Sequence, residues 1–202
     1  MEITDFHKDA ICEAMNIGAG QAGAVMSELV NKNIAIAIPQ VEFIEISTVR
    51  NYLDEHFTDW KSCINLSLSS GIKGEAILIF SEQSAKGWFE AIALAQFGSL
   101  EMLTPEMETD LLIEVGNILI NNSVGGLANL INITVDYAIP KHFSKVSGEI
   151  FESLLDNDRS GHLGMIMTTN LKIEGEEIET DLMLTLSRES LNEIFKKLES
   201  LV

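Results

Sequence analysis

Acid and amide side chains with helical spacing are the residues in this sequence best suited to chemistry. Asp9, Glu13 and Asn16 form an Asp-x3-Glu-x2-Asn pattern. Because residues three and four apart share one face of a helix, this spacing puts the acid and the amide side by side. No Ser, Cys or Lys nucleophile and no His joins this stripe. Any reaction there would therefore depend on positioning a water or a partner group.

The same pattern returns 101 positions later as Asp110, Glu114 and Asn117. A proline also follows each asparagine at a distance of 23 positions, Pro39 in the first half and Pro140 in the second. Four residue types thus share one displacement without a gap, which indicates an internal duplication. An isolated Glu-x2-Asn pair is most often just a solvated helix face, but duplication with matched prolines favours a functional interpretation.

Hydrolysis of an aspartyl phosphate is a reaction that such a pattern could support. Phosphoryl transfer depends largely on in-line orientation and charge stabilisation. A neutral carboxamide can hold a water through one donor and one acceptor without adding negative charge. A carboxylate one turn away can pair with a lysine of the substrate protein. Apolar residues occupy the other faces of both helices, so we expect the carboxylates and the amides to face solvent or a partner.

The elements that carry the two motifs are long helices, expected over about 6–31 and 105–131. Thr4 or Asp5 can cap the first, and Thr104 with Pro105 begins the second. Strand-like runs follow each helix, and a shorter helix closes each half, over about 84–97 and 189–201. The second half has about five extra residues, which we place between Ser147 and Gly161.

A unit of helix, three strands and helix, taken twice, predicts an α+β fold with pseudo-twofold symmetry. Helices would pack on a mainly antiparallel sheet of about six strands. We expect residues 1–202 to form one domain made of two pseudo-repeats, about 1–100 and 101–202, because a 100-residue half would have little core of its own.

Composition limits the partners and the compartment. The formal charge is −18 with only 13 Lys and Arg residues, which disfavours binding to nucleic acid or to anionic membranes. The longest apolar runs are too short to span a bilayer, and the acidic start, Met1 to Asp5, gives no secretory signal. The cytoplasm is the expected location. The cysteines and histidines have no metal-ligand spacing, so we expect no metal or cofactor of the protein's own.

Gly18 to Gly23 satisfy a G-x-G-x-x-G pattern, which in the right context binds a dinucleotide. Here the pattern lies within a predicted helix instead of following a strand. Small residues that let another backbone approach closely are the favoured interpretation.

The D/S-x3-E-x2-N-x22-P pattern, together with Asn16 to Gly20, Ser27 and Leu29, resembles the CheC/CheX/FliY phosphatases of bacterial and archaeal chemotaxis. The resemblance spans essentially the whole chain. Two complete motifs in about 200 residues are similar to the CheC type. CheX is shorter with one active motif, and FliY has an added flagellar-switch domain that this sequence lacks.

This resemblance implies that the substrate is a phosphorylated CheY-like response regulator, which would itself carry Mg²⁺. It assigns water orientation to Asn16 and Asn117 and lysine contact to Glu13 and Glu114. Asp9, Asp110, Pro39 and Pro140 complete the motif as supporting residues. The receptor deamidase CheD is a further partner that the resemblance implies.

Two alternatives remain open at this point. The chain could bind the phosphorylated regulator as a component of the flagellar switch without hydrolysing it, or it could act chiefly as a regulator of the deamidase. The second motif also departs after its asparagine, where Ile118 to Asn121 replace Ile17 to Gly20. The two sites are therefore expected to differ.

Overall fold

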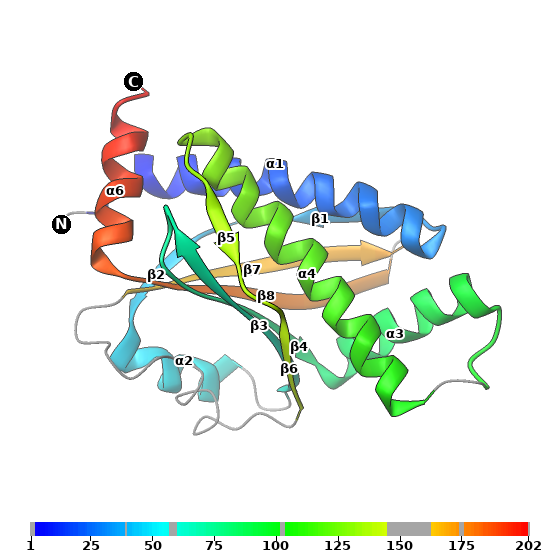
Figure 1. Ribbon diagram of the computed structural model, residues 1–202. Helices are drawn as coiled ribbons and strands as arrows, with labels where there is room; N and C mark the ends of the chain where they lie inside the picture. The colour runs from blue at the N-terminus through cyan, green and yellow to red at the C-terminus, as the bar shows by residue number, and fades with distance from the viewer. Residues whose placement is uncertain are drawn as a thin grey trace.

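The structure is a computed structural model that describes residues 3–38, 40–56, 60–101, 104–144, 163–173 and 176–201. Pro39 and the extra residues expected between Ser147 and Gly161 lie outside these ranges. Helices cover one face of a twisted antiparallel sheet, with a shorter helix on the opposite face (Figure 1). The α+β fold predicted from the sequence is confirmed.

Local capping signals fix where the helices begin. Helix α1 (Asp5–Val30) follows Thr4, whose hydroxyl accepts the His7 N–H, and α4 (Pro105–Leu130) follows Thr104, whose hydroxyl accepts the Met107 N–H. Ser81 and Ser187 cap α3 (Glu82–Phe97) and α6 (Arg188–Glu199) in the same way. All four helices lie within a few residues of their expected bounds because a cap satisfies backbone groups next to it in sequence.

Among the described residues the sheet contains eight strands, where about six were expected. The additional strands lie after the long helices, where each half has two short strands. In the second half Pro140 lies between them, and a proline has no N–H to donate to a sheet. The strands are β1 (Ile34–Ala37), β2 (Glu42–Glu45), β3 (Trp60–Ser70), β4 (Gly74–Ser81), β5 (Val135–Tyr137), β6 (Lys141–Ser144), β7 (Leu163–Ile173) and β8 (Glu176–Leu186).

The halves exchange strands across the sheet. The strand order is β1-β7-β8-β4-β3-β5, with β2 also paired to β7 and β6 also paired to β3. The first two strands of each half therefore pair with a strand of the other half, while β4 and β8 pair at the centre. In the described part of the chain, neither half therefore has a complete sheet of its own.

Side chains of β4 alternate between two apolar clusters. Ala76, Leu78 and Phe80 belong to the larger cluster beneath α1, α3, α4 and α6, whereas Ile77 and Ile79 belong to a smaller one on the opposite face. Helix α2 (Val49–His56), which follows a 3-10 turn (Ile46–Thr48), contributes to the smaller cluster. The sequence did not predict α2, because two helical turns have little intrinsic stability and depend on tertiary packing.

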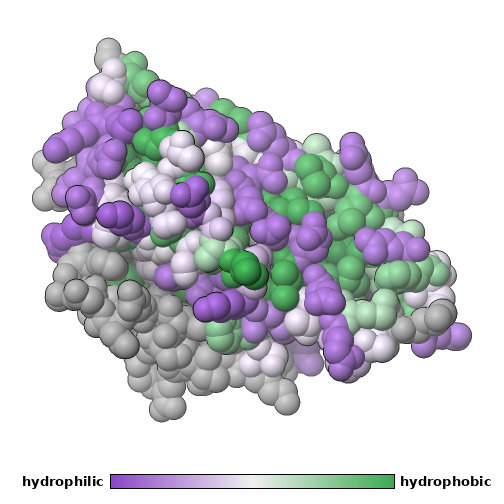
Figure 2. Space-filling model, viewed as in Figure 1, coloured by the Kyte–Doolittle hydropathy of each residue, from purple (hydrophilic) through white to green (hydrophobic). Residues whose placement is uncertain are grey.

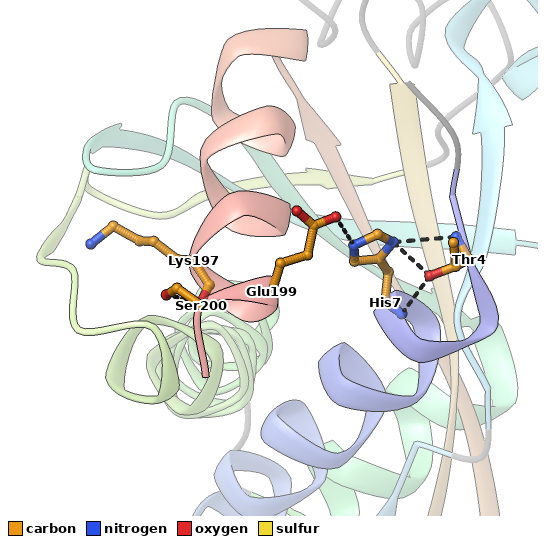
Figure 3. Close-up of polar contacts among 5 residues, drawn as sticks. All are labelled: Thr4, His7, Lys197, Glu199 and Ser200. Atoms are coloured by element: carbon orange, nitrogen blue, oxygen red, sulfur yellow. Dashed lines mark hydrogen bonds and ion pairs between the residues drawn. The ribbon is translucent and has the colours of Figure 1, made fainter. Parts of the chain in front are cut away.

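The start of α1 is held against the end of α6 by His7 (Figure 3). His7 Nδ1 accepts the Thr4 N–H at 3.2 Å, and Nε2 lies 3.1 Å from Glu199 Oε1. The imidazole also stacks on Phe195 with 4.3 Å between ring centroids. These contacts fix the direction in which α1 enters the fold and thus the placement of the first motif.

Glycine lets the backbones of α1 and α4 touch where the helices cross. A Cβ on Gly18 would lie 2.0 Å from the Asn122 carbonyl oxygen, and a Cβ on Gly126 would lie 2.3 Å from the Ala14 carbonyl oxygen. The close-approach interpretation of the glycine pattern is thus correct for Gly18. A Cβ on Gly20 would meet nothing within 4 Å, so this glycine needs another explanation.

Gly126→Ala is expected to lower the free energy of unfolding by roughly 1–3 kcal/mol, because the new methyl group would push the two helices apart. Gly125→Ala is a matched control, since a Cβ there meets nothing within 4 Å. That change should stabilise the helix by roughly 0.5–1 kcal/mol. Urea unfolding of both variants checks the expectation, and equal stabilities would contradict the described crossing.

The expectation that every apolar segment is too short to span a bilayer is wrong for helix α4. By length and composition it is long and apolar enough, and it alone passes that test among the residues the structure describes. Yet 61% of its apolar window is buried inside the protein. A core helix satisfies the same criterion, so α4 is explained by the packing of its side chains on the sheet.

Candidate functional site

The carboxylates of both motifs project from α1 and α4 into solvent. Asp9 and Glu13 on α1 and Asp110 and Glu114 on α4 are exposed. No hydrogen bond or ion pair joins any of these four to another residue in the described ranges. Their expected exposure is confirmed, and each glutamate is free to pair with a cation on another protein.

The side chain of Asn16 does not face solvent as the sequence suggested. Its Oδ1 accepts the Ile38 N–H at 2.7 Å, and its Nδ2 donates to the Ile38 carbonyl at 2.7 Å and to the Cys12 carbonyl at 3.0 Å. Asn16 is half-buried and Ile38 is 1% exposed. The amide therefore closes the end of β1 onto α1, and both of its donor hydrogens are in use.

Cys12 belongs to this arrangement, although the sequence analysis placed no cysteine on the stripe. Its Sγ donates to the Ile38 carbonyl at 3.0 Å and lies 3.5 Å from Asn16 Nδ2. Burial, with a smaller contribution from Asp9, raises the pKa of the Cys12 thiol. A protonated, hydrogen-bonded thiol supports the strand end and is a poor nucleophile. Cys12 lies four positions before Asn16, so helical spacing was the feature of the sequence that indicated a thiol beside this amide.

Asn117 has different partners from Asn16. Its Oδ1 accepts Nδ2 of Asn121 at 2.8 Å, while its own Nδ2 donates to no acceptor among the described residues. Ile139, the counterpart of Ile38, is 86% exposed and does not close over the asparagine. Asn117 thus keeps two donor hydrogens and one acceptor lone pair for a water or another ligand.

The difference arises in the strands that follow the helices. Tyr137 stands where the first half has Ile36, and its hydroxyl donates to the Asn121 carbonyl at 3.4 Å. Burial raises the pKa of Tyr137 to about 12, so the hydroxyl remains a donor at neutral pH. Tyr137 was not predicted from the sequence, whereas the helical spacing placed Asn121 on the same face as Asn117 without assigning it a role at the site.

The first motif lies in a segment that matches a known protein family. A model of the CheC-like family matches residues 6–42, the segment that contains the first motif and Ile38. The CheY-P phosphatase CheC of Bacillus subtilis (strain 168) is 21% identical over 197 residues, which is 96% of this chain and 94% of that protein. The chain is therefore similar to the CheC-like family over residues 6–42 and to this phosphatase over most of its length.

Solved structures of other proteins have the same fold as this chain. FliY of Thermotoga maritima is 16% identical and covers 99% of each chain, with a TM-score of 0.78. The FliM middle domain from H. pylori is 10% identical, covering 96% of this chain and 99% of that one, with a TM-score of 0.69. At these identities the likeness establishes the fold alone.

The polar groups of the described residues do not gather into a metal site. In the parts of the chain that are described, no group of three or more His, Cys, Asp or Glu side chains could hold a metal ion. His142 on β6 is half-buried, and its Nε2 has no hydrogen-bond partner. Burial lowers the pKa of His142, against a smaller opposing effect of Glu108, so the ring is neutral at pH 7.

Proposed function

We propose that this protein is a phosphatase that hydrolyses the aspartyl phosphate of a CheY-like response regulator. The observation that carries the proposal is an exposed, unpaired glutamate one helical turn before an asparagine, present on both α1 and α4. The relationship to a protein named CheY-P phosphatase over 96% of the chain supports it. A soluble, cytoplasmic location would follow from such a substrate.

In the proposed reaction a water attacks phosphorus in line with the leaving aspartyl oxygen. The new P–O bond forms to the water oxygen, the bond to the aspartyl oxygen breaks, and the products are the regulator's carboxylate, inorganic phosphate and a proton. Asn117 would hold the water with one donor and one acceptor, and Glu114 would pair with a lysine of the regulator. Mg²⁺ on the regulator would stabilise the phosphoryl oxygens.

The two motifs would contribute unequally. Asn117 has donor hydrogens to offer, whereas Asn16 must first leave Ile38, since both of its hydrogens are already bonded. We therefore assign the larger share of hydrolysis to the second motif. The first motif would act fully only in complexes in which the end of β1 moves away from α1.

Glu13→Ala combined with Glu114→Ala is expected to raise the KM for the phosphorylated regulator by about tenfold, because each carboxylate would lose a charge-assisted contact. Glu28→Ala is the matched control, since Glu28 is exposed on α1 outside the motif. Steady-state kinetics at two salt concentrations measure the effect. Equal KM values for the double variant and the control would restrict the glutamates to a role in solubility.

The alternative function is that of a switch-type module that binds the regulator without hydrolysing it. Its support is the structural likeness to the FliM middle domain. Regulation of the deamidase CheD is a further proposal, for which direct titration of the two purified proteins is the test. Regulation of the deamidase would either accompany the phosphatase activity or be the main function in its place.

Phosphate release from a response regulator supplied with acetyl phosphate and Mg²⁺ separates the first two functions. A phosphatase accelerates release in proportion to its concentration, and chelation of Mg²⁺ removes the substrate and the effect together. A binding module leaves the rate unchanged or slows it while forming a complex that size-exclusion chromatography detects.

A further inference from the structure

The second motif contains a polar residue that the first motif lacks. Asn121 lies one turn after Asn117, at the position where α1 has Gly20. Its Nδ2 donates to Asn117 Oδ1 at 2.8 Å. A side chain at Gly20 would have open space around it, so the absence of an equivalent residue in α1 does not result from crowding.

The backbone of Asn121 is tied to the neighbouring strand. Tyr137 on β5 donates its hydroxyl hydrogen to the Asn121 carbonyl at 3.4 Å. Asn121 Oδ1 is buried without a hydrogen-bond partner in the described structure. Because one end of this amide is bonded and the other is enclosed, Asn121 is an oriented donor and not a freely rotating surface group.

We infer that Asn121 is a positioning residue of the second site: it holds the Asn117 amide with its carbonyl oxygen inward and its NH₂ group available to a water. This inference rests on the proposed function. The terminal torsion of an asparagine is broad and roughly two-fold, so an unsupported amide samples both orientations. One supporting hydrogen bond selects the orientation that leaves the donors free.

In the first site the motif asparagine is oriented by a backbone group instead of by a second asparagine. There the backbone of Ile38 holds the Asn16 amide and consumes its donors. Asn121 orients Asn117 while leaving them available. The additional donor, Asn121, and not only the Glu-x2-Asn spacing, therefore determines which motif asparagine can hold a water.

Substitutions at Asn121 test this role in a Glu13→Ala background, which weakens the first site without touching the Asn16 contacts. Asn121→Gly copies α1 and should lower kcat about fivefold with little change in KM for the regulator. Asn121→Asp should lower kcat further, because a carboxylate facing Asn117 Oδ1 repels it and draws the NH₂ group inward. Asn121→Gln retains a donor and should restore part of the activity that Asn121→Gly loses.

A second readout does not depend on activity. Nuclear magnetic resonance relaxation of the Asn117 side-chain NH₂ group should show an ordered amide in the wild-type protein and a more mobile one in Asn121→Gly. An ordered amide in both, or kcat values for Asn121→Gly and Asn121→Asp equal to that of the Glu13→Ala parent, would overturn the inference. If no form of the protein hydrolyses a phosphorylated regulator, the proposed function fails, and the amide mobility alone then decides whether Asn121 orients Asn117.

Discussion

Asn117→Ala is expected to lower kcat for aspartyl-phosphate hydrolysis by at least about tenfold, and by about 100-fold if the first site contributes little. The physical reason is that Asn117 alone of the two motif asparagines keeps donor hydrogens free for a water. The same change should leave thermal stability almost unaltered, because the half-buried side chain makes one hydrogen bond, to Asn121, among the described residues.

Asn129→Ala provides the matched control for this substitution. Asn129 is exposed near the end of α4, outside the motif. Single-turnover decay of the phosphorylated regulator, measured with saturating protein, isolates the chemical step from binding. Decay as fast with Asn117→Ala as with Asn129→Ala would show that Asn117 does not hold the attacking water.

Asn16→Ala is expected to have the opposite profile, with a large effect on stability. Removing the amide leaves the buried Ile38 N–H without a partner and removes one donor from the Ile38 carbonyl. The free energy of unfolding should fall by about 2–3 kcal/mol. For a chain of this size that corresponds to a decrease in Tm of roughly 5–10 °C.

Gln21→Ala, on the exposed face of α1, is the control for Asn16→Ala. Urea unfolding followed by circular dichroism gives the comparison, provided that the slopes agree between variants. If Asn16→Ala unfolds at the same urea concentration as Gln21→Ala, the contact between Asn16 and Ile38 is not a significant part of the folded state.

The sequence predicted features that depend on nearby residues. Thr4 and Thr104 cap their helices because a cap hydroxyl bonds a backbone N–H three residues away, and the duplicated motif is visible because both helices keep their spacing. The exposure of Glu13 and Glu114 followed from the same periodicity.

The sequence did not predict features that depend on distant pairing. Asn16 meets Ile38 only because β1 pairs with β7 of the other half, which brings the end of β1 onto α1. The exposure of Ile139 likewise depends on how β5 ends beside β3. Helical periodicity could therefore place the two asparagines on equivalent faces but could not distinguish their hydrogen bonding.

The surface around the motifs suits a partner whose binding face contains both charged and apolar side chains. Figure 2, which has the viewpoint of Figure 1, shows hydrophilic and hydrophobic residues interspersed over this side of the molecule instead of one continuous apolar patch. Ile17 is 58% exposed one turn after Glu13 on α1. A partner that offers both a lysine and apolar side chains would match these residues.

Turnover with excess substrate is the most direct test of whether the chain is a catalyst. Purified phosphorylated response regulator, freed of phosphodonor and supplied with Mg²⁺, is mixed with one tenth of its concentration of this protein, and the remaining phosphorylated regulator is measured over time. We predict complete loss of the phosphoryl group at a rate above the regulator's own, so that each chain acts many times. An unchanged or extended lifetime, with binding of the regulator retained, would contradict the account and favour a switch-type module.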